Sequence, residues 1–182
     1  MRTMLKIINY LKKYPITYSI LRTIFRFFVK LARGIDYLRL KYIFGIGQVG
    51  RNVRFDKGFQ VFHGAKNISI GNNIFLADVL LNAGDADASI TIEDFVFFSH
   101  KVMVIARGHD YQKLDKERQK AITEAPIVIK RGAWIGAGAT ILKGVTIGQN
   151  AVIAAGSLVT KNVDDNTIVA GIPAKLIKSI QR

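Results

Sequence analysis

A chain of 182 residues is long enough for one domain with a sizeable core and a short appended segment. It contains no cysteine, which excludes disulfides, thiolate metal sites and an acyl-cysteine intermediate. The formal net charge is +14, and ten lysines and arginines against the single acid Asp36 give residues 1–45 a charge of +9.

Residues 1–45 are predicted to form a basic amphipathic helical segment, with a further short helix before Pro15. Large apolar residues recur there at helical spacing, namely Ile20, Ile24, Phe27, Leu31, Ile35, Leu38 and Tyr42. The basic residues on the other side are Arg22, Arg26, Lys30 and Arg33. No uncharged run approaches the roughly 18 residues that span a bilayer. The segment therefore either associates with an anionic membrane surface or packs its apolar side on the rest of the protein or on a neighbouring subunit.

Residues 1–45 also indicate where the protein is located and whether it binds nucleic acid. It lacks an uninterrupted apolar stretch followed by a small-residue cleavage site, so we expect a cytoplasmic protein, with the inner face of the membrane as the alternative location. Its basic residues are interleaved with large aliphatics, and no nucleic-acid recognition motif accompanies them. Nucleic acid is therefore not expected as a partner.

Residues 46–182 carry a repeat of six residues that predicts an all-β parallel β-helix. In its clearest stretch the aliphatics are Ile129, Ile135, Ile141, Ile147, Ile153 and Val159, and their small companions are Ala133, Ala139, Val145, Ala151, Ser157 and Val163. A companion and the aliphatic residue that follows it, such as Ala133 and Ile135, are two positions apart. Both side chains therefore point to one face of a short strand. An ordinary parallel α/β sheet would need helices between strands, and residues 127–163 leave no room for them.

The register begins earlier, near Val49, slips between Asn82 and Ala88, and is broken by a polar excursion at 107–125. These breaks are predicted to be loops on one rod, because the repeat continues on both sides of each. A rod that served only as a scaffold would need no interruption, so the excursion, which opens with Arg107, Gly108 and His109, is the predicted site of chemistry.

The stretch from Ile68 to Ile177 resembles the left-handed β-helix acyltransferases with hexapeptide repeats, specifically the sugar O-acetyltransferase branch with the maltose and galactoside acetyltransferases. The motifs that carry the resemblance are Gly108–Asp110, Gly132–Gly136, Gly144–Gly148, Val152–Ser157, Val159–Lys161 and Gly171–Lys175. The resemblance implies transfer of an acetyl group from acetyl-CoA to a hydroxyl of a sugar or glycan, with no metal. It also implies a homotrimer whose active sites are shared between subunits, and a role in surface polysaccharide biosynthesis.

A sugar hydroxyl needs a base to take its proton, and histidine suits this near neutral pH. The resemblance makes His109 that base, with His63 and His100 as weaker competitors, and leaves the group that orients the imidazole unnamed. It also implies that the backbone N–H of Ala137 stabilises the oxyanion and that Trp134 lines the cleft.

Coenzyme A carries phosphates that cations can pair with. The residues implied to bind it are Ala155, Thr160, Lys161, Lys175 and Lys178. On the acceptor side the family carries an asparagine where this chain has Ala77, so the neighbouring Asp78 is the candidate, with Asn82 and Asp85 also nearby.

Three other functions remain open from the sequence. A nucleotide-sugar N-acetyltransferase would need the same base. A γ-type carbonic anhydrase would use the same rod and bind a metal through three histidines, although His100 and His109 stand farther apart than expected for it. A non-catalytic scaffold would leave His109 without a role.

Overall fold

The computed structural model describes residues 15–181, so the short helix predicted before Pro15 lies outside the described residues. Contacts divide the chain into two compact units, one up to Ile35 and the other from Asp36 onward. The helix α2 (Pro15–Leu38) runs across this division and is followed by a π-helical turn at Arg39–Ile43. The domain boundary expected between residues 45 and 46 stays a prediction.

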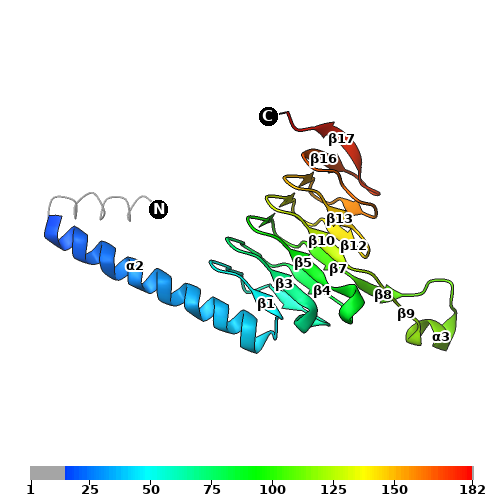
Figure 1. The fold of residues 1–182 in the computed structure, drawn as a ribbon, viewed down its shortest axis with the longest axis horizontal. Coiled ribbons are helices and arrows are strands. Elements are labelled where there is room, and N and C mark those ends of the chain that lie inside the picture. Colours follow the sequence, from blue (N-terminus) through cyan, green and yellow to red (C-terminus); the bar gives the residue numbers. More distant parts are fainter. Residues whose placement is uncertain (1–14, 182) are drawn as a thin grey trace. The chain divides into compact units, whose positions relative to one another are not determined.

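The unit from Asp36 onward is a parallel β-helix, as the six-residue repeat predicts, and it is left-handed, as the family resemblance implies. Its strands form three five-stranded sheets, stacked along the rod (Figure 1). In the first two coils the side of sheet B has only isolated bridges, at Arg54 and Phe75. Sheet A contains β1 (Gln48–Val49), β3 (Ile68–Ile70), β5 (Ile90–Ile92), β10 (Ile127–Ile129) and β13 (Thr146–Ile147). Sheet B contains β6 (Phe97–Phe98), β11 (Trp134–Ile135), β14 (Val152–Ile153), β16 (Thr167–Ala170) and β17 (Lys175–Ser179). Sheet C contains β2 (Gln60–Val61), β4 (Leu80–Asn82), β7 (Met103–Ile105), β12 (Thr140–Leu142) and β15 (Leu158–Val159).

The core consists of the aliphatic and small residues of the repeat. Ile129, Ile135 and Ile141 are fully buried, and so are their companions Ala133 and Ala139. Successive strand residues point to opposite faces, which puts this set inside and leaves the residues between them outside. The inward register of the sequence is therefore confirmed.

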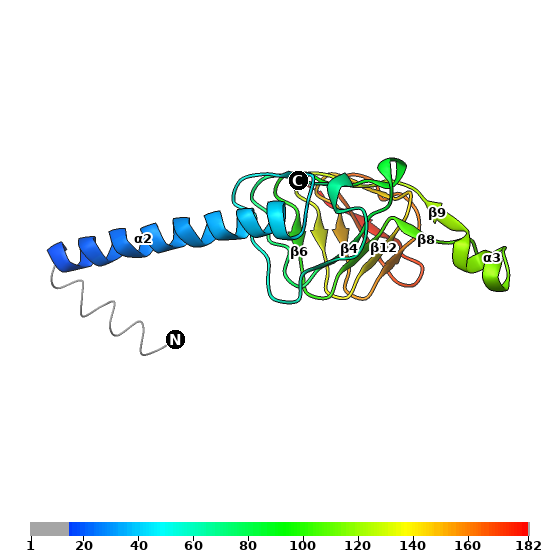
Figure 2. The ribbon, with the colours of Figure 1, turned by 90° about the horizontal axis from the view of Figure 1, so that it is seen from below.

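The turns stack into three edges of the rod, which we name by the sheets they join. The AB edge comprises residues 50–53, 71–74, 93–96, 130–133, 148–151 and 164–166. The BC edge comprises residues 55–59, 76–79, 99–102, 136–139 and 154–157. The CA edge comprises residues 62–67, 83–89, 106–126, 143–145 and 160–162. All the long turns lie on the CA edge: two contain short 3₁₀ turns (Ala65–Asn67 and Ala86–Ala88), and the longest forms a hairpin that projects from the rod (Figure 2).

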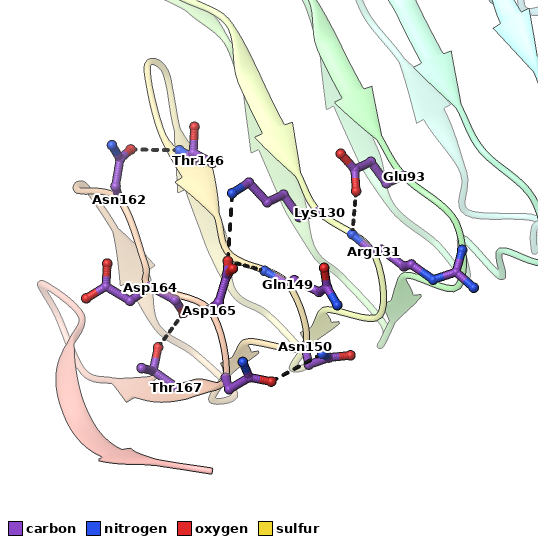
Figure 3. Close-up of polar contacts among 11 residues, drawn as sticks. Glu93, Lys130, Arg131, Thr146, Gln149, Asn150, Asn162, Asp164, Asp165 and Thr167 are labelled. Atoms are coloured by element: carbon purple, nitrogen blue, oxygen red, sulfur yellow. Dashed lines mark hydrogen bonds and ion pairs between the residues drawn. The ribbon is translucent and has the colours of Figure 1, made fainter. Parts of the chain in front are cut away.

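The AB edge has one residue in each coil with a positive φ, and most of these residues are asparagine or glycine. They are Asn52, Asn73, Phe95, Gly132, Asn150 and Asn166. Asparagine and glycine tolerate this left-handed conformation, whereas an aromatic residue rarely adopts it. Side chains also join successive coils here. Asp165 accepts a hydrogen bond from the Gln149 backbone N–H (2.7 Å), and Asn150 donates to Asn166 (3.2 Å; Figure 3).

Both ends of the rod are covered by chain that does not continue the parallel stacking. At the C-terminal end β17 pairs antiparallel with β16, with Ala170 opposite Lys175. At the other end the π-helical turn places Leu40 in the core, where it is fully buried. The aliphatic interior is therefore closed at both ends.

Candidate active site

His109 is the last residue of β8 (Arg107–His109), which pairs antiparallel with β9 (Ile122–Glu124) and is joined to it through α3 (Asp115–Lys120). An ion pair between Arg107 and Glu124 (3.2 Å) and a hydrogen bond from the Asp85 backbone N–H to Glu124 (3.1 Å) fix the base of this hairpin on the CA edge. The hairpin therefore holds the histidine away from the rod at a defined place.

The imidazole of His109 has a fixed tautomer. Its Nδ1 lies 2.9 Å from the backbone carbonyl oxygen of Arg118. A carbonyl oxygen can only accept a hydrogen bond, so Nδ1 carries a proton, and in the neutral imidazole Nε2 keeps the lone pair. The side chain is exposed and borders an open pocket of about 540 Å³ with Asp115, Arg118 and Gln119. His109 is thus prepared to accept a proton through Nε2.

The Arg118 side chain holds this carbonyl in position. Its Nε donates to the Lys113 carbonyl oxygen (2.7 Å), and its Nη2 donates to that of Tyr111 (3.2 Å). The orienting group that the sequence left unnamed is therefore a backbone carbonyl, in a loop cross-linked by one guanidinium.

The BC edge stacks Ala137 and Ala155 in neighbouring coils. The Gly156 N–H donates to the Ala137 carbonyl oxygen (2.8 Å), and the Gly138 N–H donates to that of His100 (2.9 Å). Neither the Ala137 N–H nor the Ala155 N–H has a hydrogen-bond acceptor among residues 15–181. These two backbone donors on the surface of the edge can therefore bind an oxygen of a ligand.

Glycine is required beside these donors. A Cβ on Gly136 would lie 2.6 Å from both the Ala155 nitrogen and the Ile153 carbonyl oxygen. Those atoms belong to the backbone of the next coil and cannot move aside. The close approach of the two coils at the BC edge therefore depends on Gly136.

Asp78 and His100 form a pair on the same edge. The Asp78 carboxylate accepts the backbone N–H of Lys101 (2.7 Å) and lies 3.1 Å from Nδ1 of His100. The Lys101 N–H is the main reason that the pKa of Asp78 lies below its ordinary value; partial burial acts in the opposite direction. The neighbouring Ala77 is buried with a positive φ and offers no polar group.

Trp134 points outward from sheet B, as expected, and is half exposed. Its indole nitrogen donates to the Ser99 hydroxyl (3.3 Å), and its ring centre lies 6.4 Å from that of Phe97. An exposed aromatic surface therefore adjoins the BC edge.

The residues expected at the site fall into two groups at opposite ends of the sheet C strands. His109, Thr160 and Lys161 belong to the CA edge, as does Asp85. Asp78, Ala137 and Ala155 belong to the BC edge, and Lys175 and Lys178 are exposed on the adjoining β17. The structure of one chain thus places the expected residues in two separate groups, which we call half-sites, and it does not bring His109 and Ala137 together.

The three histidines make separate contacts. His63 lies 3.1 Å from the Asn82 side-chain oxygen on the CA side, whereas His100 pairs with Asp78 and His109 with Arg118. Among residues 15–181 no group of three or more histidine, aspartate or glutamate side chains could hold a metal ion.

Two of these features were missed by the sequence reasoning. The Arg118 carbonyl carries no sequence signal, because any residue type would provide it. The pairing of Asp78 with His100 did have a signal: both residues occupy BC turns of successive coils, as the repeat places them.

The chain matches known proteins over most of the β-helix. Residues 126–161 match the family model described as bacterial transferase hexapeptide (six repeats). A galactoside O-acetyltransferase of Escherichia coli (strain K12) is 38% identical over 133 residues, which is 72% of this chain and 63% of that enzyme. The chain thus matches slightly less than two thirds of the length of this curated relative.

Solved structures show the same similarity. A maltose O-acetyltransferase from Clostridium difficile 630 has a TM-score of 0.66 at 33% identity, over 75% of this chain and 71% of that chain. A hexapeptide-repeat acetyltransferase from Vibrio cholerae O1 biovar eltor, complexed with acetyl coenzyme A, has a TM-score of 0.67 at 29% identity. The match covers 80% of this chain and 76% of that one.

Proposed function

The chain belongs to the bacterial hexapeptide-repeat transferase family, and from this membership we propose that it transfers an acetyl group from acetyl-CoA to a hydroxyl group of a sugar. The observation that carries the proposal is the state of His109. Its Nδ1 proton is committed to the Arg118 carbonyl, which leaves Nε2 as the basic atom on an exposed hairpin. That is the state a general base for an alcohol requires.

The protein acts as a homotrimer in this proposal. Its two half-sites lie at opposite ends of the sheet C strands, and the outward side of this sheet is largely apolar through Leu80, Met103, Ile105, Leu142 and Leu158. A three-fold arrangement with sheet C facing the axis buries this surface. It also sets the CA edge of one protomer beside the BC edge of the next.

In that arrangement each active site takes its base from one protomer and its oxyanion donor from a neighbour. Nε2 of His109 removes the proton from the sugar hydroxyl while the oxygen attacks the thioester carbonyl carbon of acetyl-CoA. The Ala137 N–H stabilises the negative oxygen of the tetrahedral intermediate. When the carbon–sulfur bond breaks, the thiolate takes the proton from His109 and leaves as coenzyme A.

The basic residues near the C-terminal end are the proposed nucleotide-binding groups. Lys175 and Lys178 on β17 pair with phosphates of coenzyme A beside the BC edge, with the pantetheine arm along Ala155. Thr160 and Lys161 approach from the CA edge of the neighbouring protomer. Asp78 contacts the acceptor, and Trp134 forms one side of the cleft.

A direct transfer assay tests the proposal. The purified protein is incubated with acetyl-CoA and a panel of sugars that includes galactosides, maltose and amino sugars, while free thiol and the mass of the product are measured. We expect thiol release only with an acceptor, and an O-acetylated product. Acetylation of amines alone would instead support the N-acetyltransferase. If none of the acceptors on the panel caused thiol release, the assignment would be contradicted. A protein that binds no acetyl-CoA would be a scaffold.

We propose that this trimer lies at the cytoplasmic face of the membrane and acts on precursors of a surface glycan. The described side chains of α2 include exposed Ile24, Phe27 and Leu31 at helical spacing, with Arg26 and Lys30 exposed as well. Arg22 and Arg33 of the predicted basic stripe lie outside the described side chains. Among residues 15–181 no helix is long and apolar enough to cross a membrane. Cosedimentation with anionic but not with neutral vesicles, lost in Phe27→Glu, is the expected result.

A further inference from the structure

The outward side of sheet B carries a continuous row of large side chains. Arg54 pairs with Phe75, Phe75 with Phe97, and Phe97 with Trp134 in successive coils. Phe97 and Trp134 are each about half exposed. Neighbouring strands lie about 4.8 Å apart, so the row is on the order of 14 Å long. We call these four residues the sheet B row.

A groove accompanies the row at its N-terminal end. It has a volume of about 260 Å³ and is lined by residues that include Asn52, Arg54, Asn73, Phe75, Phe95 and Phe97. The Asn52 amide donates to the Asn73 side-chain oxygen (2.9 Å), which leaves the Asn52 oxygen and the Asn73 amide nitrogen for a ligand. The Arg54 guanidinium lies 5.6 Å from the centre of the Phe75 ring. Apolar ring surfaces thus alternate with hydrogen-bonding groups.

Phe95 stands out on the AB edge. It adopts a φ of 60°, in a column where the other coils have asparagine or glycine. Its ring is half exposed and lies under the Arg131 guanidinium, 4.5 Å from the ring centre. A bulky residue in this conformation carries backbone strain, and such strain is concentrated at functional sites. The ring of Phe95 is not part of the core, so burial does not explain why this position has an aromatic residue.

We propose that the sheet B row and its groove bind the extended part of an oligosaccharide acceptor, with the acetylated sugar near Trp134 and further sugars along Phe97 and Phe75 toward Arg54. This inference rests on the proposed acetyl transfer to sugars. Sugar rings offer apolar C–H faces between hydroxyl groups, and the alternation of rings and polar groups in the groove matches that chemistry. The proposed trimer takes its subunit contact from the apolar side of sheet C, so it does not require the arginines and asparagines found here.

The test uses the fluorescence of Trp134, which is the single tryptophan of the sequence. The probes are linear gluco- and galacto-oligosaccharides of two, three and six sugars, titrated into the trimer with coenzyme A present. We expect affinity to increase with length in at least one series. Phe95→Asn introduces the asparagine that most other coils have at the equivalent position of the AB edge. It should weaken hexasaccharide binding at least about fivefold. Its melting temperature should be equal to or higher than that of the wild type.

Phe62→Ala is the matched control, because Phe62 is exposed but lies on the CA edge outside the groove. It should leave the dependence of affinity on length unchanged. Affinity independent of length in both series would overturn the inference, and the proposed function would stand if a short sugar is still acetylated. A Phe95→Asn variant with unchanged affinity and a lower melting temperature would show a purely structural role. Loss of the trimer in Phe75→Ala would show that this face is a subunit contact.

Discussion

The BC and CA edges are built from the same repeat and yet differ in how they can serve chemistry. After the five-residue turn of the first coil (55–59), the turns of the BC edge all have four residues, and the candidate groups of this edge are mainly backbone N–H donors at Ala137 and Ala155. The CA edge varies from coil to coil, and its candidate group is the side chain of His109 on an inserted hairpin. A strict repeat therefore suits a fixed binding surface, and a departure from the repeat introduces a reactive side chain.

The largest effect is expected from His109→Ala. Loss of a general base should lower kcat by about two to four orders of magnitude. The melting temperature should change little, because the side chain is exposed and its hydrogen bond is to the Arg118 carbonyl on the same hairpin. Steady-state kinetics and thermal unfolding measure the two effects. His63→Ala serves as the control on the same edge, and full activity in His109→Ala would show that the hairpin does not supply the base.

A pair of glycine substitutions probes the rigidity of the BC edge. Gly136→Ala should lower the free energy of unfolding by roughly 3 kcal/mol, because the new methyl group meets the backbone of the next coil. Gly138→Ala should cost about 1 kcal/mol, since its φ of 68° is unfavourable but open space surrounds the position. Urea denaturation provides both values. Equal losses at the two positions would mean that the coils can separate at this edge.

The pairing of Asp78 with Lys101 and His100 predicts a pH-dependent contribution to stability. The folded-state pKa of Asp78 lies below its ordinary value of 3.8, so the ionised carboxylate stabilises the fold above about pH 4. This contribution is lost as the pH falls through the lower folded-state pKa. Asp78→Asn should therefore be less stable than the wild type at pH 7, and the difference should shrink below pH 4 in acid-denaturation curves.

Asp87→Asn, at an exposed carboxylate on the CA edge, is the control for this experiment. A difference between Asp78→Asn and the wild type that stayed constant down to strongly acidic pH would mean that the charge of Asp78 is not what stabilises the turn.

The smallest effect is expected from Ala137→Ser. The proposed oxyanion donor is the backbone N–H, and the side chain is exposed, so kcat should stay within about twofold of the wild type. The transfer assay measures this. A loss comparable to that of His109→Ala would show that the BC edge acts through a side chain, which would remove the contrast between the two edges.

The fold could be predicted from the sequence because the period of six dictates it. Each of Ile129, Ile135 and Ile141 must face inward if every coil is to bury its apolar residues, and the structure confirms this register. The sequence also places the slips correctly as loops on one rod. Their shared position on the CA edge follows from counting turns, since each break comes after a strand of sheet C.

The site could be predicted only in part, because its residues are placed by contacts that no spacing encodes. His109 was identified by residue type and motif, whereas its tautomer depends on the carbonyl of Arg118, nine residues further along the chain. The resemblance implies active sites shared between subunits, but a list of functional residues does not say which edge of the rod each residue occupies. The same holds for Phe95. Its positive φ becomes unusual only when it is compared with the asparagines at the equivalent positions of the other coils.

The closed ends of the rod have a consequence for solubility. Each coil presents unpaired peptide groups to whatever comes next, so a bare terminal coil could template a second molecule and nucleate a fibril. The reversed direction of β17 and the buried Leu40 at the opposite end interrupt that propagation. Deletion of β17, or of the helical turn that carries Leu40, should therefore convert a protein of finite size into one that polymerises end to end.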